Sequence, residues 1–269
     1  MIAAGDHRAE VAAWREGRYA NLRRDTSWLT LAGLGWLSLG VNRVGADPDA
    51  DVVLPAGPRD AGVITVTPDG AAAEGTWLRE GQPIGAIPLV TDASGEPTLL
   101  ELGDLRLCVI ERGGRLAVRT WDISSSRRRD FAGIDHWPVD PGWRLEARFV
   151  PTPERVLEVP DVLGIVESKE SPGVVVFEAD GGEHRLEALR GGEDGSMWIV
   201  FGDATNGTET YGGGRFVYTA PPAGETVVID FNRSYNPPCV FSPFATCPLP
   251  WEANRLPIRI EAGERFPNG

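Results

Sequence analysis

Residues 98–122 read TLLELGDLRLCVIERGGRLAVRTWD. Three runs rich in β-forming residues are joined here by Gly103-Asp104 and by Gly113-Gly114, and such dipeptides are typical of tight turns between strands. The run LRLCVIER alternates between apolar and polar residues, which predicts that Cys108 lies in a core. The stretch therefore predicts three consecutive strands.

The same pattern of short strands and turns extends in both directions along the chain. Toward the N-terminus, residues 41–55 favour two short strands around an Asp/Pro turn, and residues 62–70 alternate and end in Pro-Asp-Gly. Toward the C-terminus, regular spacing of β-rich runs is typical of a barrel or sandwich. Seven strands are predicted there, at residues 143–151, 155–162, 173–180, 184–191, 196–203, 214–220 and 226–232.

Residues 6–24 favour a helix, because apolar side chains recur at helical spacing on one broad face. The polar and Pro-rich stretch at 124–143 is the best candidate for a boundary. The fold class is therefore mainly β, with an N-terminal helix followed by a β-sandwich and a second β sandwich or barrel. The predicted segments are 1–27, 28–130 and 131–269, the last containing a Pro/Cys-rich loop.

The composition supports this fold and limits the partners. The chain of 269 residues contains 33 Gly and 22 Pro, which suits many short strands. A net charge of −13 disfavours nucleic acids and anionic membranes. The first ten residues lack the basic start and apolar core of a signal peptide, and the apolar stretch at 28–39 is too short to span a bilayer. We expect a cytoplasmic protein with reduced thiols.

The first polar segment that points to a function is FGDATNGTETYGGGRF, residues 201–216. Three glycines before an arginine allow backbone N–H groups to approach a ligand closely, and an arginine fork suits a carboxylate or phosphate. The alternative is a hairpin loop whose shape an Asp–Arg ion pair fixes. The candidate ligand-binding residues are Asp203, Thr210, Tyr211 and Arg215.

The second segment is DFNRSYNPPCVFSPFATCPLPWEAN, residues 230–254. Its prolines exclude a helix, and its aromatic content predicts a packed, ordered loop. Asp230 ends a strand, where a carboxylate can act as general acid or base together with Tyr235. Asn232 and Asn236 add ligand-binding donors and acceptors. The alternative is a loop that only holds the fold together.

Cys239 and Cys247 leave several interpretations open. A disulfide would close a short loop but conflicts with a reducing compartment. A metal site needs more ligands, and none of the three histidines lies in this segment. A nucleophilic Cys239 needs a base, for which His136 would have to approach through the fold. Buried, packed thiols are the remaining interpretation. No metal and no cofactor is predicted.

Three motifs carry a resemblance to a known family: SWLTLAGLGWL near the start, FGDATNGTETYGGGRF, and DFNRSYNPPC with TCPLP after it. From Trp14 to Glu264 the chain resembles the bacterial and archaeal family called domain of unknown function 1684. The resemblance implies a shared fold and identifies residues of interest. It implies no particular activity.

Residues 28–130 also resemble a forkhead-associated β-sandwich in the order of strands and turns. Gly45, residues 51–54 and Gly103-Asp104 carry this resemblance. Ala46 stands where that family has an arginine, and no Ser-x-x-His follows Leu54. The resemblance therefore implies a similar sandwich without the residues that bind phosphothreonine.

Three functional hypotheses follow. The first is a pocket in the C-terminal β subdomain that binds a small polar or anionic molecule, with turnover of that molecule left open. The second is a non-catalytic protein-interaction module built on the sandwich. The third is a structural protein in which the loop at 230–254 only holds the fold together.

Overall fold

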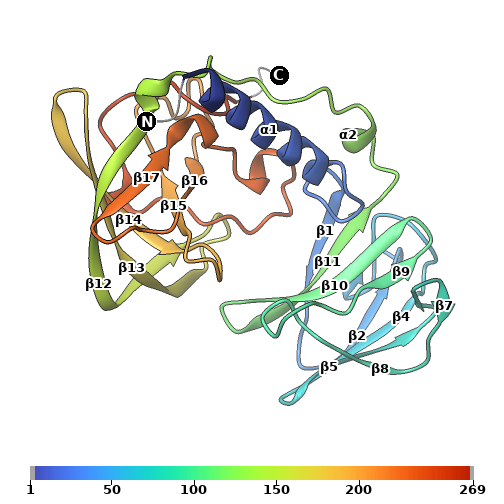
Figure 1. Ribbon diagram of the computed structural model, residues 1–269. Helices are drawn as coiled ribbons and strands as arrows, with labels where there is room; N and C mark the ends of the chain where they lie inside the picture. The colour runs from blue at the N-terminus through green and yellow to red at the C-terminus, as the bar shows by residue number, and fades with distance from the viewer. Residues whose placement is uncertain (1–3, 267–269) are drawn as a thin grey trace. The chain divides into compact units, whose positions relative to one another are not determined.

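The computed structural model describes residues 4–266, which form two compact units, each discontinuous in sequence (Figure 1). Unit 1 comprises the residues up to Ala20, Ala132–Val240 and the residues from Thr246 onward. Unit 2 comprises Asn21–Phe131 and Phe241–Ala245. The predicted mainly β fold, with a helix at its N-terminal end, is confirmed.

Unit 1 is built on a closed antiparallel barrel of six strands. The strands are β12 (Arg144–Pro160), β13 (Val166–Ala179), β14 (Gly182–Arg190), β15 (Met197–Phe201), β16 (Arg215–Thr219) and β17 (Thr226–Asp230). Each strand pairs with the next along the chain, and β12 also pairs with β17, so the sheet has no open edge.

One part of the strand prediction is wrong. The two strands expected at 143–151 and 155–162 are a single long strand, β12, which pairs with β17 from Arg144 to Arg148 and with β13 from Arg148 to Pro160. The register shifts between Pro151 and Arg155, and this irregularity accommodates the prolines that had indicated a break. The sequence pattern therefore overstated the number of strands by one.

Apolar side chains fill the interior of the barrel. Alternate residues of each strand point inward, as the predicted face of Leu145, Ala147 and Phe149 on β12 illustrates. Phe231, which directly follows β17, is fully buried among them. These side chains form one packed apolar core inside the barrel.

The rest of unit 1 consists of helices and ordered loops. Helix α1 (Ala4–Leu22) buries Val11 completely and belongs to unit 1 up to Ala20, since its polar and aromatic side chains contact that unit. The short 3₁₀ helices are η1 (Pro141–Trp143), η2 (Phe231–Arg233), η3 (Pro238–Val240) and η4 (Glu252–Asn254). Three of these four lie within residues 230–254, which explains how such a Pro-rich segment remains ordered.

Unit 2 contains two sheets that share one apolar core. The six-stranded sheet has the order β1 (Leu31–Trp36), β11 (Arg115–Asp122), β10 (Leu105–Arg112), β9 (Leu100–Leu102), β6 (Leu78–Arg79) and β7 (Gln82–Pro83). The five-stranded sheet has the order β3 (Val52–Val53), β2 (Gly40–Gly45), β4 (Gly62–Thr67), β5 (Gly70–Gly75) and β8 (Ile87–Leu89). A four-residue helix, α2 (Ser126–Arg129), follows the last strand.

The stretch at 98–122 folds as predicted. It forms β9, β10 and β11, joined by turns at Gly103-Asp104 and Gly113-Gly114. Cys108 is buried, and its burial raises the pKa of the thiol to about 12. This cysteine is therefore an unreactive thiol at neutral pH.

Candidate functional site

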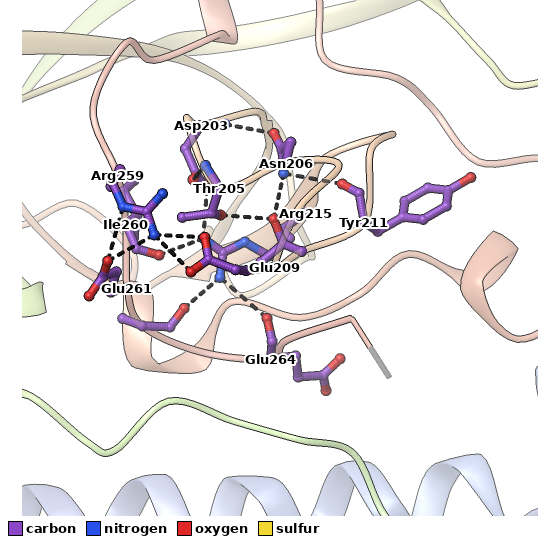
Figure 2. Close-up of polar contacts among 12 residues, drawn as sticks. Asp203, Thr205, Asn206, Glu209, Tyr211, Arg215, Arg259, Ile260, Glu261 and Glu264 are labelled. Carbon is purple, nitrogen blue, oxygen red and sulfur yellow. Dashed lines mark hydrogen bonds and ion pairs between the residues drawn. The ribbon is translucent and has the colours of Figure 1, made fainter. Parts of the chain in front are cut away.

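Arg215, at the start of β16, is held by a closed set of acceptors inside unit 1 (Figure 2). Its Nη2 donates to Asp203 Oδ2 at 2.6 Å and to the carbonyl oxygen of Ile260 at 2.8 Å. Its Nη1 donates to the carbonyl oxygens of Ala262 and Glu264. Neither charged side chain of the ion pair has any exposed surface. Burial lowers the pKa of the Arg215 guanidinium, and the charge of Asp203 opposes that shift.

This geometry matches the interpretation in which an Asp–Arg ion pair fixes the loop. The guanidinium fork holds the C-terminal segment 260–264 against the loop that begins at Asp203. Both terminal nitrogens donate to internal acceptors, and the side chain has no exposed surface that an external anion could reach. We therefore do not include Arg215 among the residues that contact a ligand.

The loop between β15 and β16 is closed by its own side chains (Figure 2). Asn206 Oδ1 accepts from the Asp203 backbone N–H at 2.7 Å, and Asn206 Nδ2 donates to Thr210 Oγ1 at 2.8 Å. The hydroxyls of Thr205 and Thr210 are 2.8 Å apart. Thr210 is thus a buried loop residue. The side chain of Tyr211 points away from this network, as Figure 2 shows.

Three consecutive glycines follow Tyr211, and their structural requirements differ. A Cβ atom at Gly213 would lie 2.4 Å from the Tyr211 ring, and one at Gly214 would lie 2.6 Å from the Phe201 carbonyl oxygen, where φ is also +89°. A Cβ atom at Gly212 would meet nothing closer than 3.8 Å. Packing therefore requires glycine at 213 and 214 and does not require it at 212.

Asp230 lies in a second, separate cluster. Its Oδ2 is 2.8 Å from His7 Nε2 of helix α1, and Arg233 Nε is 3.5 Å from the same oxygen. Its Oδ1 accepts from the backbone N–H and from the side-chain amide of Asn232, and so caps η2. Asn232 also exchanges two hydrogen bonds with the backbone of Asp140. Asp230, His7 and Asn232 are all buried.

Tyr235 lies in an aromatic cluster on the same loop. Its ring stacks on Tyr218 with 6.2 Å between centroids and an interplanar angle of 4°. It meets Phe216 edge-on, and the Arg18 guanidinium lies 4.6 Å from its centroid. Burial raises the pKa of the Tyr235 phenol, so this group remains protonated at neutral pH. Its contacts are typical of a side chain that packs the loop against helix α1.

Asn236 contacts a buried carboxylate near the end of the described chain. Its backbone N–H donates to Glu264 Oε2 at 2.7 Å, and its side-chain amide donates to the Arg265 carbonyl oxygen at 2.8 Å. Arg18 of α1 forms an ion pair with both carboxylate oxygens of Glu264. Glu264 has no exposed surface. It therefore links helix α1 to the loop at 230–254.

A third cluster brings Tyr211 to the two cysteines. The Tyr211 hydroxyl and the Cys247 thiol both hydrogen-bond to the Cys239 thiol, and the Cys239 backbone N–H donates to Cys247 Sγ at 3.0 Å. Both cysteines are reduced thiols. Cys239 is partly exposed, whereas Cys247 is 2% exposed. Of the predicted ligand-binding residues, Tyr211 alone reaches this cluster among the contacts within residues 4–266.

The predicted residues thus do not lie in one cluster. Asp203, Thr210 and Arg215 fix the glycine loop, while Asp230 and Asn232 lie beside His7. Among the described residues, none of these five side chains hydrogen-bonds to Tyr235 or contacts its ring. Within the same residues, no cluster of three or more His, Cys, Asp or Glu side chains is placed to hold a metal ion. No helix in the described part of the chain is both long and apolar enough to cross a bilayer.

Sequence analysis did not identify His7, Arg18 and Glu264 as partners of the loop. Arg18 and His7 lie on helix α1, and only their position on the face that carries Val11 and Trp14 hinted at a buried role. Glu264 lies in a short charged stretch that looks exposed from sequence alone. Nothing in the spacing of these three residues indicated that they would be buried together.

His136 gives unit 1 a pH-dependent stability. Its Nδ1 donates to the Ile134 carbonyl oxygen at 2.6 Å, and burial, followed by the charge of Arg15, lowers its pKa to about 4. The pKa of an unperturbed histidine is about 6.5. Between about pH 4 and pH 6.5 the unfolded chain therefore binds a proton at His136 that the folded chain does not bind. The stabilisation is complete above pH 6.5 and is lost as the pH falls toward 4.

We therefore expect the stability difference between wild type and His136→Gln to shrink by roughly 2 kcal/mol between pH 7 and pH 4. Urea unfolding of both proteins across this pH range measures the effect. Subtracting one profile of unfolding free energy against pH from the other removes the contribution of the carboxyl groups, which both proteins share. Parallel pH profiles for the two proteins would contradict the assignment.

The comparisons with known proteins agree with the motifs. A model of the family described as "Protein of unknown function (DUF1684)" matches residues 129–265. The solution NMR structure of the uncharacterized protein from gene locus rrnAC0354 of Haloarcula marismortui is similar at 31% identity, with a TM-score of 0.44. That match covers 52% of this chain and 79% of the archaeal protein. No curated protein matches. Because the family model covers just over half of the 269 residues, the chain belongs to the DUF1684 family.

Proposed function

We propose that unit 1 binds a small polar or anionic molecule at the turn Tyr211–Gly214. One observation carries the proposal: among the described residues, no acceptor is placed on the backbone N–H groups of Gly212 and Gly213. The turn itself is closed by the Gly214 N–H, which donates to the Tyr211 carbonyl oxygen at 3.0 Å. Successive backbone N–H groups in a turn are typical anion-binding donors.

The surroundings of the turn support this assignment. Arg215 and Asp203 fix the loop from the interior, so the turn is rigid while its amides remain available. Gly212 is exposed, and neither its φ nor its neighbours require glycine. Packing therefore does not explain why position 212 lacks a side chain. A need for open access to the backbone amides does explain it. Tyr211 adds a partly exposed aromatic ring, stacked on Phe266 at 6.0 Å.

Gly212→Val tests the site. We expect the fold to be retained, since the Cβ position is open, and anion binding to be lost because the side chain covers the two amides. The probes are phosphate, sulfate and succinate, titrated at constant ionic strength and followed by the amide resonances of Gly212 and Gly213. A probe at 100 times its dissociation constant should also stabilise the wild type by about 2.7 kcal/mol.

Gly85→Val is the matched control, because Gly85 is exposed and a Cβ atom there meets nothing within 4 Å. This variant should bind the probes as the wild type does. Resonances of residues 211–214 that do not shift with any of the three anions would overturn the proposal. So would equal shifts in wild type and Gly212→Val.

Turnover is not part of this proposal. The expectation that Asp230 acts with Tyr235 as general acid or base stays a prediction. Asp230 is engaged by His7, Asn232 and Arg233, and Tyr235 is engaged by aromatic rings. Such contacts support a role in holding helix α1, so binding is the function that the geometry favours. The expected cytoplasmic location also stays a prediction.

A second candidate is a protein-interaction module on the forkhead-associated-like sandwich. Its support is the arrangement of two sheets on one core in unit 2, together with Leu39 and Val41, which are 76% and 64% exposed. Amide shifts confined to residues 39–41 on addition of a protein partner would favour this candidate. Amide shifts at residues 211–214 on addition of small anions would favour the binding site at the turn Tyr211–Gly214.

A further inference from the structure

We propose that Cys239 and Cys247 form a redox-active dithiol, in which Cys239 reacts with a hydroperoxide and Cys247 then closes a disulfide. The inference concerns thiol chemistry and does not rest on ligand binding at the glycine turn. It selects among the interpretations that the sequence left open.

The loop holds both cysteines in a fixed arrangement. Cys239 lies in η3, which directly follows Pro237, and its backbone N–H points at Cys247 Sγ at 3.0 Å. The Cys247 carbonyl oxygen accepts from the Val162 N–H at 2.9 Å, which ties this residue to the segment after β12. Because the Cys239 backbone nitrogen lies only 3.0 Å from Cys247 Sγ, the two side chains can meet in a disulfide without a large movement of the backbone.

The two cysteines are not equivalent, and the difference assigns their roles. Cys239 is partly exposed and so accessible to a small oxidant, whereas Cys247 is 2% exposed and accessible mainly to Cys239. The attacking thiol of a peroxide-reactive pair must meet solvent, and the resolving thiol must meet the first sulfur. Cys239 is therefore the attacking residue.

The surroundings of Cys239 favour the thiolate, which is the nucleophilic form. The pKa of its thiol is lowered, first by the hydrogen bond from Cys247, with further contributions from the Tyr211 hydroxyl and the N–H groups of Cys239 and Val240. Burial and the contact with Cys239 raise the pKa of Tyr211, which therefore remains a donor. Cys108 provides the contrast, since burial raises its pKa to about 12.

The chemistry balances with a hydroperoxide as the only oxidant. The Cys239 thiolate attacks the terminal peroxide oxygen, so an S–O bond forms, the O–O bond breaks, and the alcohol or water leaves after taking up a proton. The sulfur of Cys247 then attacks the resulting sulfenic acid. The S–S bond forms, the S–O bond breaks, and water leaves with the proton of Cys247. Two thiols are oxidised and one peroxide is reduced.

The test uses the full chain and hydrogen peroxide. One equivalent should remove two of the three thiols and lower the intact mass by two hydrogen atoms. Peptide mapping should place the new bond between Cys239 and Cys247, and a dithiol reductant should restore both thiols. Three free thiols after this treatment, or a disulfide that includes Cys108, would overturn the proposal.

Variants separate the two roles. In Cys247→Ser the reaction should stop at a sulfenic acid on Cys239, which dimedone traps, and Cys247→Ala provides the same readout if serine disturbs packing. Cys239→Ser should leave Cys247 reduced. Cys108→Ser is the matched control and should behave as the wild type. Dimedone labelling on Cys247 rather than on Cys239 would reverse the assignment and contradict it. Ligand titrations on the reduced protein test the glycine turn independently.

Discussion

Arg215→Met is expected to lower the free energy of unfolding of unit 1 by about 3–5 kcal/mol, because it leaves the carboxylate of Asp203 buried without its partner. The side chains of the pair have no exposed surface, so water cannot replace the lost guanidinium. The carbonyl oxygens of Ile260 and Ala262 lose their donor in the same step. Hydrogen exchange of β15 and β16 amides measures the loss within this unit.

The double variant Asp203→Asn with Arg215→Met is the informative control. It removes both charges, so we expect it to be more stable than the single variant Arg215→Met. If the single and double variants are equally stable, the ion pair is not the source of the effect. The loss would then have to come from the backbone carbonyl groups that Arg215 holds.

Phe231→Ala should cost about 3–5 kcal/mol, the usual range for removing a fully buried phenylalanine. Its ring has no exposed surface and packs against Trp143, Phe177 and Phe201 at centroid distances of 5.4 to 6.0 Å. Because it closes the core of the barrel directly after β17, the cavity would lie where the strand and the loop at 230–254 meet. Equilibrium unfolding in guanidinium chloride measures the loss.

Phe266→Ala serves as the comparison, since the same residue type is 43% exposed there. Its unfolding free energy should change by less than about 1 kcal/mol. A small effect at Phe231 would mean that the barrel collapses around the missing ring. In that case the loop would contribute little to the core, and its aromatic content would need another explanation.

The sequence predicted the local elements well because local propensity determines them. The turns at Gly103-Asp104 and Gly113-Gly114 allow few alternatives, and the strands on either side alternate clearly. The break expected after Pro151 was wrong, since a register shift keeps β12 continuous through its prolines. Whether proline ends a strand depends on the neighbouring strand, which the local sequence does not reveal.

The site was harder to predict, because its contacts also depend on residues that lie far away in the sequence. The pattern before β16 correctly indicated a rigid loop, but it did not reveal that internal carbonyl oxygens would occupy the fork of Arg215. The cysteine spacing left four interpretations, which differ only in what lies around the sulfur atoms. The hydrogen bond from Tyr211 to Cys239 spans 28 residues, and no local pattern encodes such a contact.

The placement of helix α1 in a unit whose strands come much later has a consequence for biosynthesis. His7 lies 223 residues before Asp230, and Arg18 lies 246 residues before Glu264. At roughly 5–20 residues per second, a ribosome needs about 12–50 s to synthesise the second interval. For most of that time the helix is outside the exit tunnel without its partners, while nearly all of unit 2 emerges. Helix α1 is therefore synthesised before unit 2 but reaches its native contacts after it, and unit 2 can fold before unit 1 is complete.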